Sequence, residues 1–158
     1  EEARRIATRA GEKLVLPKDA VIADAFRQDA RTQVVEVGAV PPGWRILDIG
    51  PTTVELFRRK LADARTILWN GPLGVWEMAT FARGTWEVGR ALGKLSATTT
   101  VVGGGDLVGA LKAGGCLSGL SHVSTGGGAM LEFLEGKKLP GIAVLEKWDK
   151  THGLDRKG

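Results

Sequence analysis

The sequence of 158 residues contains one cysteine, two histidines and no tyrosine. A single cysteine, Cys116, excludes an internal disulfide and is typical of a reducing compartment, so we expect a cytoplasmic protein with Cys116 as a small buried side chain. The scarcity of cysteine and histidine also excludes a zinc cluster. No apolar run approaches the ~18–20 residues of a membrane span, and no membrane association is expected.

The sequence also lacks a large excess of charge of either sign. Lysine and arginine total 22 against 18 aspartates and glutamates, a net charge of +4, and the two signs are interspersed. Because no cluster of arginines and aromatics accompanies this small excess, nucleic-acid binding is not expected. The chain opens without methionine or a signal peptide, on a stretch that resembles the end of an amphipathic helix stopped at Gly11. We therefore expect a fragment of a longer protein.

Glycine, by contrast, is abundant: 23 of 158 residues, about twice the usual share. Ordering consecutive glycines is entropically costly, so a triplet needs a physical reason. Two triplets occur, at 103–105 and 126–128, and each follows a β-branched run and precedes a helical pattern.

Short apolar runs alternate with helical patterns along the chain. The predicted strands are 13–17, 21–25, 45–50, 66–71, 98–104 and 122–125, with 142–145 as a possible seventh. The predicted helices are 51–64, 80–95 and 127–135. Several strands are continuous apolar runs, as in strands buried on both faces. This order predicts an α/β fold with a doubly wound, mostly parallel sheet in a Rossmann-like three-layer arrangement.

Two details concern the ends of these elements. Thr52 and Glu55 have the spacing of a capping box at the start of the first helix, directly after Pro51. The polar tail, residues 148–158, is expected to fray or to dock on a part of the protein outside this sequence.

In doubly wound sheets, ligands bind at the carboxyl ends of the strands. A helix that begins there offers unpaired N–H groups and a partial positive charge, and glycine lets an anion approach the backbone. The two triplets therefore favour phosphate binding, with tight structural turns as the alternative. The usual dinucleotide fingerprint fails at Val108 and Leu131, and no P-loop motif is present.

Three polar residues lie near these triplets or at another strand end. Asp106 is either the N-cap of the next helix or a carboxylate ligand for Mg²⁺ beside bound phosphates, and spacing leaves both open. The stretch WNGPLGVWE (69–77) ends another strand and carries Asn70 and Glu77. They fit a phosphate and a pair of ribose hydroxyls, or else they belong only to a Gly-Pro turn.

Four segments together resemble phosphoglycerate kinases: DIGPTT (48–53), LWNGPLGVWE (68–77), VVGGGDL (101–107) and SHVSTGGGAMLEFLEGKKLPGIAVL (121–145). The resemblance covers residues 1–147 and implies the later portion of the nucleotide-binding C-terminal domain of a two-domain kinase. Members of this family transfer a phosphoryl group between 1,3-bisphosphoglycerate and MgADP in glycolysis, giving 3-phosphoglycerate and MgATP. The bisphosphoglycerate binds the N-terminal domain, which this sequence lacks, and the parent is expected to be a monomer.

The resemblance also implies roles for individual residues. Asp106 would bind Mg²⁺, Glu77 the ribose hydroxyls and Asn70 a phosphate of ATP or ADP, while Leu47 and Pro72 would line the nucleotide pocket. Backbone contacts to phosphate or to the transferring group would come from Gly103, Gly104, Gly105, Leu107, Thr125, Gly126, Gly127 and Gly128.

The sequence departs from the family pattern in three ways. Leu107 replaces a residue that usually carries a hydroxyl, so only its N–H remains for a phosphate. Ile46 replaces a small residue at the adenine pocket. The acyl-phosphate-binding domain and the basic segment with the catalytic lysine are absent. We therefore expect the fragment to be inactive alone, with a non-catalytic nucleotide-binding module or a purely structural fragment as alternatives.

Overall fold

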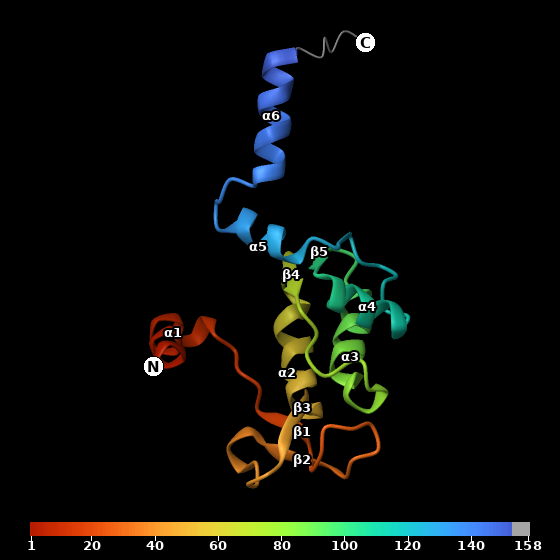
Figure 1. Cartoon of the computed structure of the whole chain (residues 1–158). Helices are drawn as coiled ribbons and strands as arrows, with labels where there is room; N and C mark the ends of the chain where they lie inside the picture. Colours follow the sequence, from red (N-terminus) through yellow and green to blue (C-terminus); the bar gives the residue numbers. More distant parts are fainter. Residues whose placement is uncertain (153–158) are drawn as a thin grey trace.

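The computed structural model describes residues 1–152, apart from the side chain of Thr151 (Figure 1). Within this range the strands form two separate three-stranded sheets. In the parallel sheet, β4 (Thr66–Asn70), β5 (Thr99–Gly103) and β6 (His122–Ser124) lie in the order β4-β5-β6. These are the strands predicted at 66–71, 98–104 and 122–125, and the α/β class is confirmed.

The other sheet is antiparallel, and the sequence does not predict it. It has the order β2-β1-β3, built from β1 (Asp19–Ala23), β2 (Thr32–Glu36) and β3 (Arg45–Ile49). The strands predicted at 21–25 and 45–50 are real, but they pair with each other and not with the parallel sheet. Strand β2 escaped detection because it is an edge strand whose side chains are almost all exposed, so no buried alternation marks it.

Two predicted strands are wrong. Residues 13–17 leave a short 3₁₀ helix, Gly11–Lys13, and continue without a pairing partner, with Leu16 60% exposed. This segment follows α1 (Glu2–Ala10). Residues 142–145 lie inside α6 (Pro140–His152), which begins at a proline. Proline suits the first turn of a helix, where its missing N–H costs nothing.

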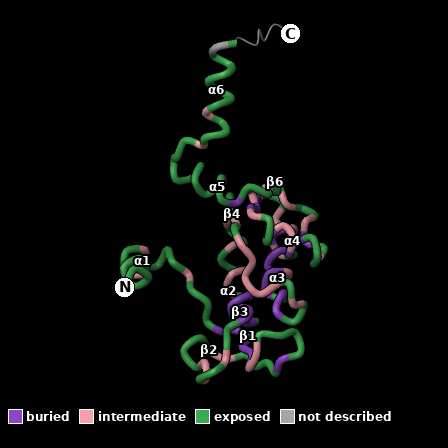
Figure 2. The backbone as a smooth tube through the Cα atoms, viewed as in Figure 1, coloured by how far each residue is buried: buried purple, intermediate pink, exposed green. Residues whose placement is uncertain are grey.

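Three helices cover one face of the parallel sheet. They are α2 (Pro51–Ala62), α3 (Arg83–Leu92) and α4 (Gly105–Ala113), and α3 follows a 3₁₀ turn at Ala79–Phe81. Side chains between helices and sheet form two clusters joined by Trp69, with Ile67 in one cluster and Val102 in the other. A third cluster of buried side chains lies around Ala23, Leu47 and Phe81, whereas α1, α5 and α6 are largely exposed (Figure 2). Leu68, on the opposite face of β4, is 43% exposed, so part of that face is uncovered in the described range.

The capping box predicted for α2 is wrong, although Pro51 does open the helix. The N-cap is Gly50, and no side chain of α2 caps it. Instead, the Asp19 carboxylate of β1 accepts hydrogen bonds from the backbone N–H of Thr53 at 2.7 Å and of Thr52 at 3.0 Å. Burial alone would raise the pKa of Asp19, but the hydrogen bonds from Thr53 and Thr52 lower it below its usual value. The Asp19 carboxylate thus links β1 to the first turn of α2.

The C-terminal part begins with α5 (Gly127–Leu134), which confirms the helix predicted at 127–135. Its apolar side chains Leu131, Phe133 and Leu134 are exposed, Phe133 by 65%. Helix α6 projects away from the sheets (Figure 1). The predicted tail therefore starts as the last turns of α6, and residues 153–158 lie outside the described residues. No helix in residues 1–152 is long and apolar enough to cross a membrane.

Candidate functional site

Three neighbouring parallel strands end at the same edge. Asn70 of β4 is in register with Gly103 of β5, and Gly103 with Ser124 of β6. The two glycine triplets continue from β5 and β6 at this edge, and α4 and α5 begin there. The structure therefore brings together Asn70 and both predicted phosphate-binding segments.

The two triplets pack directly on one another. A Cβ atom at Gly127 would lie 2.6 Å from the Cα and 2.9 Å from the N of Gly104. The Gly104 N–H donates to the Ser124 carbonyl at 3.0 Å, and the Asn70 side-chain amide donates to the Gly127 carbonyl at 3.2 Å. Gly104 also has φ +102°, which side chains rarely adopt. The positive φ thus explains Gly104, and close packing explains Gly127, without any ligand.

The remaining glycines divide into two kinds. Gly103 faces the end of the flexible Met130 side chain of α5, which occupies the space beside it. Gly105 and Gly128, each in the first turn of a helix, have nothing within 4 Å of a built Cβ atom. Gly126 and Thr125 are exposed beside them. These open positions lack a packing reason, and they present backbone at two helix starts.

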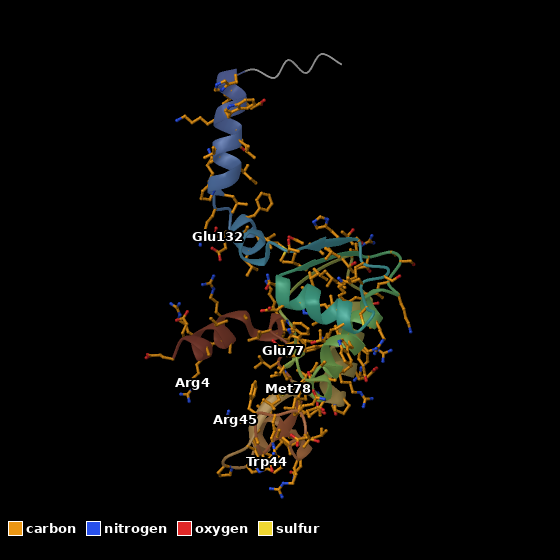
Figure 3. The ribbon with its side chains drawn as sticks, turned by 45° about the vertical axis from the view of Figure 1, so that its right-hand side comes forward. Arg4, Trp44, Arg45, Glu77, Met78 and Glu132 are labelled. Carbon is orange, nitrogen blue, oxygen red and sulfur yellow. The ribbon has the colours of Figure 1, made fainter. Side chains whose placement is uncertain are left out.

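Asp106 does not cap α4. The N-cap is Gly104, no side chain caps the helix, and Asp106 lies exposed in its first turn. Its carboxylate shares a cavity of about 500 Å³ with Pro72 and Glu77 of the 71–78 loop, which follows β4. The walls of this cavity also include Phe26, Trp76 and Met78. Figure 3 shows Glu77 and Met78 in this region. Of the two roles left open by the sequence, the N-cap is therefore wrong.

A second cavity of about 390 Å³ adjoins the first and shares Pro72 with it. Its walls include Leu47 and Leu73, and Ile46, which is 52% exposed. Leu47 itself is nearly buried at 5% exposure. The Val75 N–H donates to the Leu47 carbonyl at 2.9 Å and so ties the 71–78 loop to β3. The residues expected to line a nucleotide pocket therefore do border one apolar cavity.

Leu107 is explained by its environment. Its side chain is completely buried in a cluster with Val102, Leu111 and Cys116. The buried thiol of Cys116 was expected, and burial raises its pKa. Since the Leu107 side chain is directed into the core, a hydroxyl in the same conformation would not reach a ligand at the start of α4.

Leu107→Thr should therefore lower the free energy of unfolding by about 2 kcal/mol, because it removes buried apolar volume and buries a hydroxyl. We expect no gain in nucleotide affinity from the new hydroxyl. Thermal or urea unfolding with a nucleotide titration checks both, and Leu131→Thr on the exposed surface of α5 is the control. Tighter nucleotide binding by Leu107→Thr would show that the side chain turns outward.

Sequence reasoning missed Asp48, in the DIGPTT segment. It is 1% exposed and accepts hydrogen bonds from the Ile49 and Gly84 N–H groups, both at 2.8 Å. Loss of hydration on burial raises its pKa to about 6, which these hydrogen bonds oppose and the nearby Glu87 carboxylate reinforces. The detectable signal is an aspartate among the apolar residues Ile46, Leu47 and Ile49 of one strand.

No group of three or more histidine, cysteine, aspartate and glutamate side chains within residues 1–152 is arranged to hold a metal by itself. A lone exposed carboxylate such as Asp106 nevertheless fits Mg²⁺, which commonly takes one or two carboxylates and completes its shell with water and phosphate oxygens.

Comparison with known proteins agrees with this geometry. The phosphoglycerate kinase family model matches residues 1–137. The phosphoglycerate kinases of Limosilactobacillus fermentum and Rubrobacter xylanophilus are each 56% identical, over 90% and 95% of this chain. The chain spans only 35% and 38% of their lengths.

Solved structures give the same result for the fold. The chain is similar to phosphoglycerate kinase from Coxiella burnetii, with a TM-score of 0.82 and 42% identity over 91% of this chain and 38% of that one. For the enzyme from Pyrococcus horikoshii the TM-score is 0.80, with 33% identity over 92% of this chain and 35% of that one. The chain belongs to the phosphoglycerate kinase family.

Proposed function

We propose that this chain supplies part of the nucleotide site of a phosphoglycerate kinase, which reversibly transfers a phosphoryl group between 1,3-bisphosphoglycerate and MgADP in the cytoplasmic reactions of glycolysis. The products are 3-phosphoglycerate and MgATP. The observation that carries the proposal is the meeting, at one sheet edge, of two helix starts with open glycines and an exposed carboxylate.

The glycines bind phosphate through the backbone. Gly105 and Gly128 leave room for an anion beside the first N–H groups of α4 and α5. Each helix start favours a negative charge by roughly 0.3–1 kcal/mol, and by up to about 2 kcal/mol in a partly buried site. In our proposal, the segment from Thr125 to Gly128 faces the transferring group, and Gly103, Gly104, Gly105 and the Leu107 N–H lie along the nucleotide phosphates.

The adjoining cavities suit the rest of a nucleotide. The apolar walls at Leu47 and Pro72 would accept a flat base, and Glu77, which lines the larger cavity, would accept hydrogen bonds from the ribose hydroxyls. The Asn70 amide already donates to the Gly127 carbonyl, so its second N–H is the one offered to a phosphate.

Asp106 would hold Mg²⁺, whose charge, when bound, offsets the charge of the phosphate oxygens. Phosphoryl transfer needs positioning and neutralised charge, with little covalent work by the protein. The chain provides positioning and charge neutralisation for the nucleotide only. The bisphosphoglycerate would bind residues outside this sequence, so we propose that the chain alone does not turn over, and that the whole protein is a monomer.

The test is a calorimetric titration with ADP in the presence of Mg²⁺. Asp106→Asn should weaken MgADP binding roughly tenfold or more, because it removes a charge-assisted metal contact. Chelating Mg²⁺ should lower the ADP affinity of the unmutated chain and leave the ADP affinity of the Asp106→Asn variant nearly unchanged. Asp63→Asn, at the exposed end of α2, is the control.

The outcomes separate the candidate functions. MgADP binding without turnover supports the proposal for this chain. A flat titration of a folded chain would instead support a purely structural fragment. Turnover by the purified chain, free of any full-length kinase, would contradict its inactivity.

A further inference from the structure

One polar atom near the nucleotide site has no partner. Among the described residues, the Trp76 indole nitrogen is the only buried side-chain nitrogen or oxygen without a hydrogen bond. An unpaired buried donor costs about 1–3 kcal/mol, so a tryptophan kept in this place needs another reason.

The ring of Trp76 rests on helix α4. A Cβ atom at Gly109 would lie 3.1 Å from Cη2 and 3.3 Å from Cζ2 of the indole, so the ring fills the space beside that glycine. Gly109 follows Asp106 by three residues, which places both on one side of α4. The indole therefore contacts the helix about one turn beyond the proposed metal ligand.

The other end of Trp76 belongs to the loop that carries Glu77. The backbone N–H of Trp76 donates to the Gly74 carbonyl at 3.0 Å, and the backbone N–H of the preceding Val75 donates to the Leu47 carbonyl of β3. Trp76, Glu77 and Asp106 border the same cavity. The backbone around Trp76 is thus fixed to β3, and its ring to α4.

We propose that Trp76 is a positioning residue, whose ring sets the separation between Glu77 and Asp106 so that one nucleotide meets both carboxylates at once. This inference rests on the proposed function, because it assigns Glu77 to the ribose and Asp106 to the metal. In this proposal the apolar ring of Trp76 holds the two carboxylates in position, and the indole N–H has no role.

The fold offers a matched control. Trp86 of α3 packs against Gly114 at the opposite end of α4, and its indole nitrogen donates to the Ala110 carbonyl at 2.9 Å. Trp86→Ala removes a comparable ring that packs on α4 from α3, at Ala110 and Gly114, which lie four and eight residues after Asp106. A purely structural role for Trp76 predicts the same result for both tryptophans.

Three variants, Trp76→Phe, Trp76→Ala and Trp86→Ala, are compared by MgADP calorimetry and by urea unfolding. Both alanine variants should lose stability. Only Trp76→Ala should lose affinity, roughly tenfold or more, while Trp76→Phe stays within about twofold of the unmutated chain. In the Trp76→Ala background, Asp106→Asn should cost much less affinity than it does alone, since the two carboxylates no longer act together.

A second measurement needs no nucleotide. The Val108 N–H donates to the Gly104 carbonyl at 3.0 Å in the first turn of α4, and its hydrogen exchange reports how firmly that turn is held. We expect faster exchange in Trp76→Ala than in Trp86→Ala. If Trp76→Ala does not fold, Gly109→Ala serves instead, because its methyl group displaces the indole by a few tenths of an ångström.

Equal losses of affinity in the two alanine variants, or a loss in Trp76→Phe as large as in Trp76→Ala, would overturn the inference and leave the proposed function standing. An unmutated chain that does not bind MgADP would overturn the proposed function and, with it, the assignment of Glu77 and Asp106 to one nucleotide; exchange at Val108 then tests only whether the Trp76 ring holds the first turn of α4. Equal exchange in the two alanine variants counts against the positioning role.

Discussion

Gly127→Ala should lower the free energy of unfolding by about 2–3 kcal/mol, and Gly128→Ala, one residue later, should leave it unchanged or raise it. The Cβ atom at position 127 would meet the backbone of Gly104, which cannot rotate away as a side chain can. Forcing an extra methyl group into close-packed structure typically costs 1–3 kcal/mol. At position 128 no atom lies within 4 Å, and alanine favours helix more than glycine does by about 1 kcal/mol.

The two alanine variants also separate packing from ligand contact at the site. Gly127→Ala moves the start of α5 away from Asn70 and Gly104, so MgADP affinity should fall together with stability. Gly128→Ala keeps the fold and narrows the open approach to α5, so affinity should fall alone. Urea unfolding and calorimetry on the same samples measure both quantities. Equal stability of the two variants would show that the contact between the triplets adjusts freely.

The second large effect concerns pH. Asp48 should make the folded chain lose about 3 kcal/mol of stability as the pH rises from about 4 to about 6. Its pKa in the folded chain is raised to about 6 from 3.8, so the folded state holds a proton that the unfolded state has already released. Stability from this group is fully present below pH 3.8 and is lost as the pH passes through about 6.

Asp48→Asn tests this, because an amide does not titrate. The unfolding free energy of the unmutated chain minus that of Asp48→Asn should decline across this range in urea denaturation at closely spaced pH values. Asp19→Asn is a control of opposite sign: the pKa of Asp19 is lowered, so its contribution is present above 3.8 and lost as the pH falls. A flat difference for Asp48→Asn would show that its carboxyl is hydrated in the folded chain.

The sequence predicted the parallel sheet and its helices well, because buried strands such as 98–104 and amphipathic helices such as 51–64 have strong periodicity. It could not predict that β1 and β3 form a separate antiparallel sheet. The composition of a short apolar strand does not reveal its partner strand or whether the two pair in parallel or antiparallel. Strand β2 is held by its hydrogen bonds to β1 and not by burial. Its three β-branched residues, Thr32, Val34 and Val35, lack the apolar alternation by which strands are recognised. The Asp19 cap of α2 joins residues 33 positions apart, which no local pattern contains.

The candidate site was predicted in outline. Asn70 ends β4 and Asp106 lies in the first turn of α4, as their spacing indicated, whereas Glu77 lies further along, in the 71–78 loop. The sequence could not separate the glycines that the fold requires, Gly104 by its positive φ and Gly127 by its packing, from the open ones, Gly105 and Gly128. That division depends on the local backbone conformation and on which backbone segments touch. Nor could spacing reveal that Leu107 is directed inward, where a hydroxyl has no ligand to meet.

The hydrogen bond from Asn70 to Gly127 spans 57 positions of the chain, and this separation bears on the order of folding. A parallel sheet must close long loops before its strands pair, and such closures are slow. Strands β4 and β5 can pair first, but the phosphate site is incomplete until α5 docks against Gly104. Nucleotide should therefore bind only after the last strand is in place, and by mass action it stabilises the finished fold without hastening the earlier steps.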